Sequence, residues 1–138
     1  MGAALALQKA IRARLVATPA VIALVPAASI LDRNQRPAPS PSIILGEAQQ
    51  VDEGNAIGRN RVRIYHAVHV WKQEPSLTGA TAITSEIRKA FGAVRLQLDP
   101  GFHCADQRVA DIRVMRDPDG ETSHGVVTIE ALILEVAT

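Results

Sequence analysis

The sequence predicts an α+β fold in which an antiparallel or mixed β-sheet carries helices packed on one face. Residues 3–17 and 77–91 place apolar side chains at helical spacing, whereas residues 61–72 and 105–136 alternate between apolar and polar side chains as half-buried strands do. Strands and helices are also segregated along the chain, which is typical of antiparallel α+β sheets. A chain of 138 residues is long enough to bury one core, so we expect a single domain over 1–138.

Residues 105–136 predict a long β-hairpin. Its tip at 116–125 contains Asp117-Pro118-Asp119-Gly120, a sequence typical of a turn. In the outgoing arm the alternation ends at Leu132-Ile133-Leu134, which indicates that both faces of this strand end are covered. We therefore treat Leu132, Ile133 and Leu134 as a candidate subunit interface.

Three helices are predicted. The apolar spacing at 3–17 predicts an amphipathic helix, and Thr18-Pro19 supplies an N-cap and a proline at the first position of a short helix through Val25. Pro75-Ser76 caps the third helix, whose apolar stripe is Leu77, Ala80, Ile83, Ile87, Ala90 and Phe91.

Further strands are predicted before and after the third helix. Residues 42–46 and 61–72 are rich in β-branched residues, and residues 29–31 and 94–98 are compatible with shorter strands. Residues 47–60 contain few apolar anchors, so we expect a loop that is mobile in an isolated subunit. Its charged and polar residues make it a candidate assembly loop: Asp52, Glu53, Asn55 and Arg59.

The strand at 61–72 has a second face that indicates an interaction surface. Arg61 and Arg63 alternate along it, and Tyr65 and Trp71 follow on the same side. A row of arginines on one strand face is usually exposed to water. Arginines beside exposed aromatic residues are, however, also typical of a protein interface, in which arginines form the rim and aromatic residues the anchor. These four residues are candidate subunit or partner contacts.

Catalytic, metal and cofactor motifs do not emerge from the sequence. His66 and His69 lie three apart on a strand and so point to opposite faces, and the single cysteine, Cys104, fits ordinary packing. The scattered carboxylates suggest no acid–base pair, and the apolar N-terminus is interrupted by charges before it reaches membrane-spanning length. We expect no cofactor, no metal and no membrane partner.

The chain resembles, over nearly its whole length, a family of tail completion proteins of long-tailed phages. The matching segments are residues 7–15, 41–46, 68–71, the helix at 82–90, and the hairpin tip at 116–120 with 124–126. The Ala- and Arg-rich composition is also similar to products of phage-derived gene transfer agents and does not decide between the two. The acidic stretch Asp52 to Gly58 departs from the family pattern.

This resemblance implies a non-enzymatic virion protein, a tail terminator that forms a ring, expected to be hexameric, at the head-proximal end of the tail tube. Its implied partners are copies of itself, the tail tube protein, and a head–tail connector or stopper protein, after assembly in the bacterial cytoplasm. DNA would pass through the lumen without specific binding.

Two alternatives remain open at the level of sequence. One is another neck component, such as a stopper or head-completion protein, which would bind the portal complex instead of the tube. The other is a small dimeric α+β enzyme or ligand-binding module, which would require a deep pocket with convergent polar groups.

Overall fold

The structure, a computed structural model, describes residues 2–33, 38–54 and 57–136. In chain order the elements are α1 (Ala3–Ala17), α2 (Pro19–Ile22), the 3₁₀ turn η1 (Ala27–Ser29), β1 (Ile30–Leu31), β2 (Ser42–Asp52), β3 (Arg61–Gln73), α3 (Thr78–Ala90), β4 (Phe102–Arg116) and β5 (Thr122–Glu135). The α+β class is confirmed, as are the long C-terminal hairpin and the strand at 29–31.

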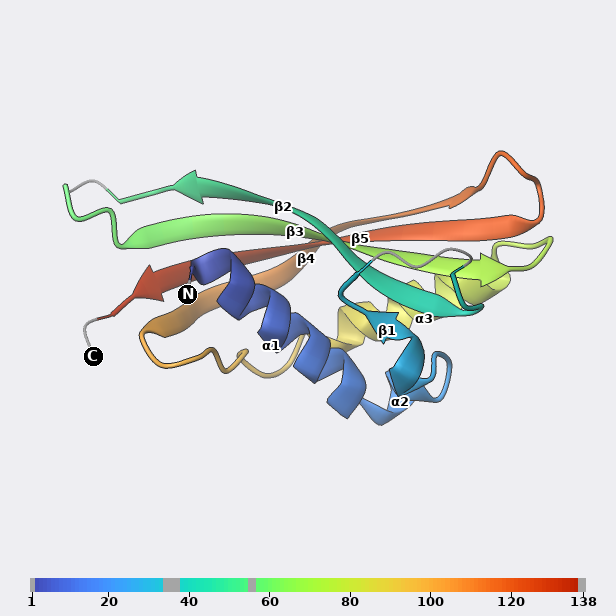
Figure 1. Cartoon of the computed structure of the whole chain (residues 1–138), viewed down its shortest axis with the longest axis horizontal. Helices are drawn as coiled ribbons and strands as arrows, with labels where there is room; N and C mark the ends of the chain where they lie inside the picture. Colours follow the sequence, from blue (N-terminus) through green and yellow to red (C-terminus); the bar gives the residue numbers. More distant parts are fainter. Residues whose placement is uncertain (1, 34–37, 55–56, 137–138) are drawn as a thin grey trace.

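The strands form one twisted mixed sheet in the order β1-β2-β3-β5-β4. Only the short β1 runs parallel to its neighbour, and the other three pairings among the described strands are antiparallel. The helices lie on one face of this sheet, as the sequence predicted (Figure 1). The opposite face carries no helix among the described residues and is called the helix-free face below.

The hydrophobic core lies between the helices and the sheet. On β3 the predicted inward residues, including Ile64 and Val68, are fully buried, and on β5 so are Val127, Ile129 and Ile133. The core is completed by Leu7, Ile11 and Leu15 from α1 and Ile83, Ile87 and Phe91 from the α3 side. Both helical stripes therefore face the sheet, because that arrangement removes their apolar side chains from water.

The predicted loop at 47–60 is corrected by the structure, because β2 continues to Asp52. A bulge lies between Leu45 and Ala48, and the pairing with β3 then resumes from Ala48↔His66 to Asp52↔Val62. Backbone hydrogen bonds to β3 hold this part of the strand even though its side chains are exposed and polar. The β2–β3 arm extends beyond the helical layer (Figure 1).

Residues 94–98 do not form the strand that their composition suggested. The segment is instead tied down by two side chains from elsewhere in the fold. Arg14 Nη1 donates to the carbonyls of Ala90 at 2.8 Å and Val94 at 2.9 Å, and Gln107 Nε2 also donates to the Val94 carbonyl at 2.8 Å. These carbonyls are therefore satisfied without a partner strand.

The helix caps also differ from the predicted ones. The hydroxyl of Thr18 donates to the Arg14 carbonyl at 2.6 Å and does not cap α2, which ends at Ile22. At α3 the Ser76 hydroxyl accepts from the Thr78 N–H, but the first turn is capped mainly by Glu74, whose carboxylate accepts from the N–H groups of Gly79 and Ala80. A carboxylate also suits the positive end of the helix dipole.

Candidate interaction surface

The helix-free face brings together the predicted interface residues of β3. Arg63, Tyr65, His69 and Trp71 point away from the core and are half-buried, while Arg61 is exposed. Across the β3–β5 pairing they meet outward residues of β5, with Tyr65 opposite Glu130 and Trp71 opposite His124. The face divides into a charged half near Arg63 and an aromatic half near Trp71.

The charged half is a network around Glu130, which is only 8% exposed. Arg108 Nε donates to Glu130 Oε2 at 2.6 Å, and Arg63 lies 3.7 Å from the same oxygen while donating to Glu53 at 2.5 Å. The hydrogen bond from Arg108 holds the pKa of Glu130 below its ordinary value, so the carboxylate stays ionised at neutral pH. Arg63 is thus engaged within the subunit.

The aromatic half is a stack of rings contributed by β3 and β5. Trp71 and His124 lie face to face with centroids 3.7 Å apart and an angle of 5° between their planes. His69 Nδ1 is 2.9 Å from His124 Nε2, and His69 Nε2 is 3.3 Å from a carboxylate oxygen of Glu47. Burial, and then the neighbouring His69, lower the pKa of His124. The stack therefore places the Trp71 ring flat against the His124 ring of the neighbouring strand.

The apolar end of β5 divides between the two faces. Ile133 is fully buried in the core, so this part of the proposed interface is corrected: its side chain is not available to a neighbouring subunit. Leu132 and Leu134 are half-buried on the helix-free face, opposite Arg63 and Arg61. The loss of alternation in the sequence thus reflects apolar side chains on both faces.

The candidate assembly loop is reduced to the turn of the β2–β3 arm. The Glu53 N–H donates to the Arg61 carbonyl at 2.9 Å and continues the ladder, while Asp52 belongs to β2. Arg59 has a φ of +47°, and its guanidinium donates to the Gly54 carbonyl. Asn55 lies outside the described residues.

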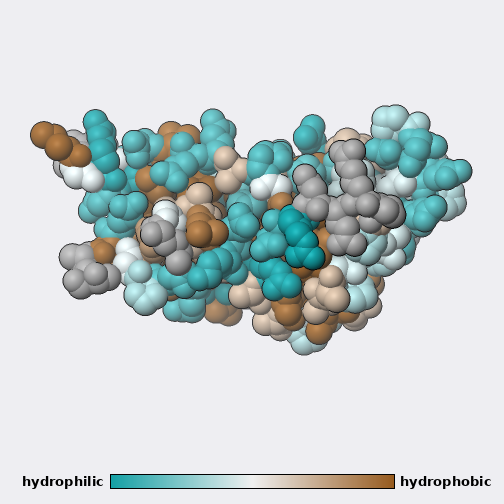
Figure 2. All heavy atoms as spheres, in the orientation of Figure 1, coloured by the Kyte–Doolittle hydropathy of each residue, from teal (hydrophilic) through white to brown (hydrophobic). Residues whose placement is uncertain are grey.

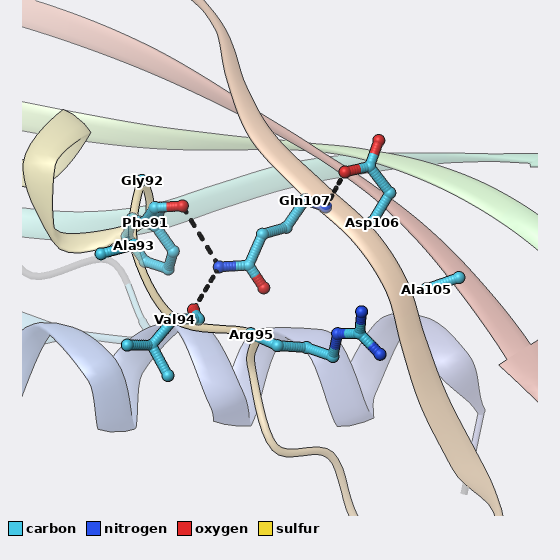
Figure 3. A pocket seen from close by; sticks show the side chains of 8 residues that line it. All are labelled: Phe91, Gly92, Ala93, Val94, Arg95, Ala105, Asp106 and Gln107. Carbon is cyan, nitrogen blue, oxygen red and sulfur yellow. Dashed lines mark hydrogen bonds between the residues drawn. The ribbon is translucent and has the colours of Figure 1, made fainter.

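A hollow lies beside the end of α3. It holds about 230 Å³ and lies between residues 91–95 and 105–107 (Figure 3). The Gln107 amide at its wall donates to the Phe91 carbonyl at 3.2 Å and to the Val94 carbonyl at 2.8 Å. The Gln107 amide is therefore engaged by the backbone of the same subunit.

In the part of the chain that the structure describes, no group of three metal-ligating side chains converges. His66 and His69 indeed lie on opposite faces, with His66 1% exposed and its Nδ1 3.0 Å from the Ala67 carbonyl. Burial raises the pKa of the Cys104 thiol, which favours a packing role. No helix within the described ranges is long and apolar enough to cross a membrane.

One surface was missed at the level of sequence. Residues 19–28 contain no polar side chain, and most are exposed: Pro19, Ala20, Ile22, Ala23, Leu24, Pro26 and Ala28. Figure 2 shows hydrophobic atoms gathered at the edge of the molecule where Figure 1 places α2. An uncharged run of ten residues is more than a helix of one turn can bury, and this excess was visible in the sequence.

The fold and the surface can now be set beside known proteins. No curated protein matches the chain in sequence. A chain in a solved structure described as "Virion of native gene transfer agent (GTA) particle" is 19% identical with a TM-score of 0.80, covering 95% of this chain and 96% of that one. The "Structure of bacteriophage SPP1 gp17 protein" is 21% identical with a TM-score of 0.60, covering 99% of this chain and 92% of that one. At these identities the likeness shows the fold.

The family follows from the sequence. The sequence model described as "Tail completion protein gp17" matches residues 9–134, which is most of the chain. The resemblance noted from the motifs is thereby confirmed. Membership of this family indicates a structural role in the virion tail. The chain therefore belongs to the tail completion protein gp17 family.

Proposed function

We propose that this chain is a tail terminator, which forms a ring, expected to be hexameric, that caps the tail tube at its head-proximal end and joins it to the head connector. The observation that carries the proposal is the match of nearly the whole chain to a chain of a gene transfer agent virion. Family membership points to the same tail context. Assembly in the bacterial cytoplasm is part of this proposal.

The helix-free face supports assembly on physical grounds. Leu132, Leu134 and Trp71 present half-buried apolar surface there, bordered by the Arg63–Glu130–Arg108 network. An apolar patch with a polar rim is the usual anatomy of a protein–protein interface. The β2–β3 arm extends past the helical layer and can reach a neighbour, the tube or the connector (Figure 1).

We also infer that the chain acts without catalysis. An enzyme needs polar groups that converge on a free volume, whereas the Gln107 amide beside the hollow at α3 is committed to backbone carbonyls. A structural tail protein needs only surfaces that bind its neighbours. DNA passing through the ring would meet no dedicated site.

The deciding experiment measures the mass of the native protein by size exclusion with light scattering, followed by negative-stain imaging with purified tail tubes. We expect hexameric rings, or monomers that become rings only on tube ends. A stable monomer or dimer that does not bind the tail tube would overturn the proposal. Binding to the portal complex in place of the tube would favour a stopper or head-completion protein.

A variant tests whether the helix-free face takes part. Leu132→Asp places a charge on the half-buried side of β5 without entering the core, whereas Ile133→Asp would disrupt the fold. We expect Leu132→Asp to remain folded but to lose rings. Thr81→Asp on the exposed side of α3 is the matched control. Unaltered assembly of Leu132→Asp would remove this residue from the interface.

A further inference from the structure

A row of ionisable side chains crosses three neighbouring strands on the helix-free face. His69 of β3 lies between Glu47 of β2 and His124 of β5. Its Nε2 is 3.3 Å from a Glu47 carboxylate oxygen, and its Nδ1 is 2.9 Å from His124 Nε2. The His124 ring also stacks on Trp71, with centroids 3.7 Å apart. The state of this histidine pair is therefore coupled to the position of the indole.

The fold makes room for the pair at one point of β2. Gly46 and Glu47 lie in the bulge between Leu45 and Ala48. A Cβ on Gly46 would lie 2.6 Å from His69 Cδ2 and 2.7 Å from His69 Nε2, so the ring occupies space that a larger residue would fill. The bulge thus places the His69 ring against the backbone of β2 and beside the Glu47 carboxylate.

The proton positions in the row follow from its acceptors. A backbone hydrogen bond, and then one from His69, lower the pKa of Glu47, so its carboxylate is ionised at neutral pH and can only accept. His69 Nε2 therefore carries a proton. In the neutral ring His69 Nδ1 is then the acceptor, and His124 Nε2 is the donor. The neutral pair is linked by one shared proton.

The pair can take up one further proton without separating, but not two. One imidazolium and one neutral imidazole still share a proton between the two nitrogens, and a cation over an indole face is favourable. When both rings are imidazolium, two N–H groups would face each other across 2.9 Å. The hydrogen bond is then lost and the two like charges repel each other. The second proton therefore drives the rings apart.

The surrounding charges determine which ring moves. The Glu47 carboxylate attracts a charged His69 and keeps it beside β2. Burial, and then the neighbouring His69, lower the pKa of His124, while Asp117 near the hairpin tip acts in the opposite direction. Asp117 thus attracts a charged His124, which we expect to leave its position and take the stacking surface of Trp71 with it. The charged and titratable groups that face the row within the described ranges are Glu47 on β2, Arg113 on β4, Asp117 at the turn, and Asp32 and Arg33 after β1; His66 of β3 is buried on the opposite face.

We propose that His69 and His124 form an acid-sensitive switch, in which the second protonation of the pair breaks their hydrogen bond and releases Trp71 from its stack. The aromatic half of the helix-free face is then arranged differently at low pH and at neutral pH. This inference goes beyond the proposed function and does not depend on it, because every contact that carries it lies within one subunit.

The experiment follows protonation and stacking in the same native protein from about pH 8 to about pH 4. NMR of the imidazole nitrogens reports the charge of each ring. Near-ultraviolet circular dichroism reports the stack, because Trp71 is the only tryptophan of the chain. We expect the pair to titrate in two steps at least about one pH unit apart. The Trp71 signal should fall with the second step while the far-ultraviolet signal stays unchanged.

Two variants separate the pair from the rest of the fold. His69→Gln still offers His124 a hydrogen-bonding partner but cannot take a proton. We expect its Trp71 signal to persist through the pH at which the wild type loses it, and His124 to titrate in one step, at higher pH than the second step of the wild type. His103→Gln, at an exposed position of β4, is the matched control and should behave as the wild type.

Gly46→Ala tests the geometry without changing any titratable group. The added Cβ displaces the His69 ring, so we expect the two-step titration to disappear.

Three results would overturn the switch. One is a wild-type protein in which both rings become charged while the Trp71 signal is unchanged. Another is a His69→Gln variant that loses the signal at the wild-type pH, which would assign the change to another group such as His66. The third is unfolding, seen in the far-ultraviolet signal, before the pair takes its second proton. Failure to form rings or to bind tubes would overturn the terminator function alone and would leave this inference standing.

Discussion

The Gln107 side chain holds the segment between α3 and β4, so its removal should destabilise the subunit. Its Nε2 donates to two backbone carbonyls, and its Oε1 accepts from the N–H of Leu96 at 2.6 Å. Gln107→Ala removes two neutral hydrogen bonds, at about 1 kcal/mol each, and leaves the Leu96 N–H without its acceptor, at about 1–3 kcal/mol. Water entering the adjacent hollow offsets part of this. We expect a loss of about 3 kcal/mol in the free energy of unfolding.

Urea unfolding followed by circular dichroism measures this loss. For a chain of this length, about 3 kcal/mol corresponds to a decrease of roughly 10 °C in the midpoint of thermal unfolding. Gln49→Ala, on the exposed part of β2, is the matched control and should change stability by less than about 0.5 kcal/mol. A Gln107→Ala protein as stable as this control would refute the claim that these hydrogen bonds hold the segment.

Three further perturbations test other parts of the fold. Glu74→Ala removes the acceptor for two N–H groups at the start of α3 and should cost about 1–2 kcal/mol by urea unfolding. Gly125→Ala would place a Cβ 2.7 Å from Thr84 Cγ2, and should lower the thermal midpoint unless α3 shifts. Burial lowers the pKa of His66 from 6.5, so the unfolded chain takes up its proton first as pH falls. Stability should therefore decline between pH 7 and 5, and His66→Gln should reduce that decline in urea titrations at each pH.

The strands with strict alternation were predictable because one side of each is buried. Val62, Ile64, Val68 and Val70 leave the register of β3 no alternative, since a slip of one residue would expose them all. The outer part of β2 lacked this signal because its side chains face water on both sides. There the strand is specified by the backbone of β3, which residue composition does not reveal.

Side chains distant in sequence account for the segment at 94–98. Its β-branched and apolar residues fit a strand, but Arg14, some 80 residues earlier, and Gln107 satisfy its carbonyls. Intrinsic strand propensity depends on a residue and its neighbours in the sequence. It therefore gives no information on which distant donor will reach the backbone of that residue. At α3 the difference is local, because Glu74, two residues before the expected Ser76, accepts from the N–H groups of the first turn.

On the interaction surface, the outward orientation of side chains was predictable from the sequence, but their partners were not. Arg63 was chosen as an outward cation, yet Glu53 and Glu130 engage it within the subunit, whereas Trp71 occupies the outward, half-buried position that the alternation assigned to it. Residues 19–28 are the reverse case, because their signal was present in the sequence but was not used in the prediction. Only Val21 and Val25 of this run are buried, so most of its apolar side chains remain exposed in the subunit. An excess of this kind is a property of sequence and fold taken together, and in a tail completion protein it is a place to look for a contact with another protein.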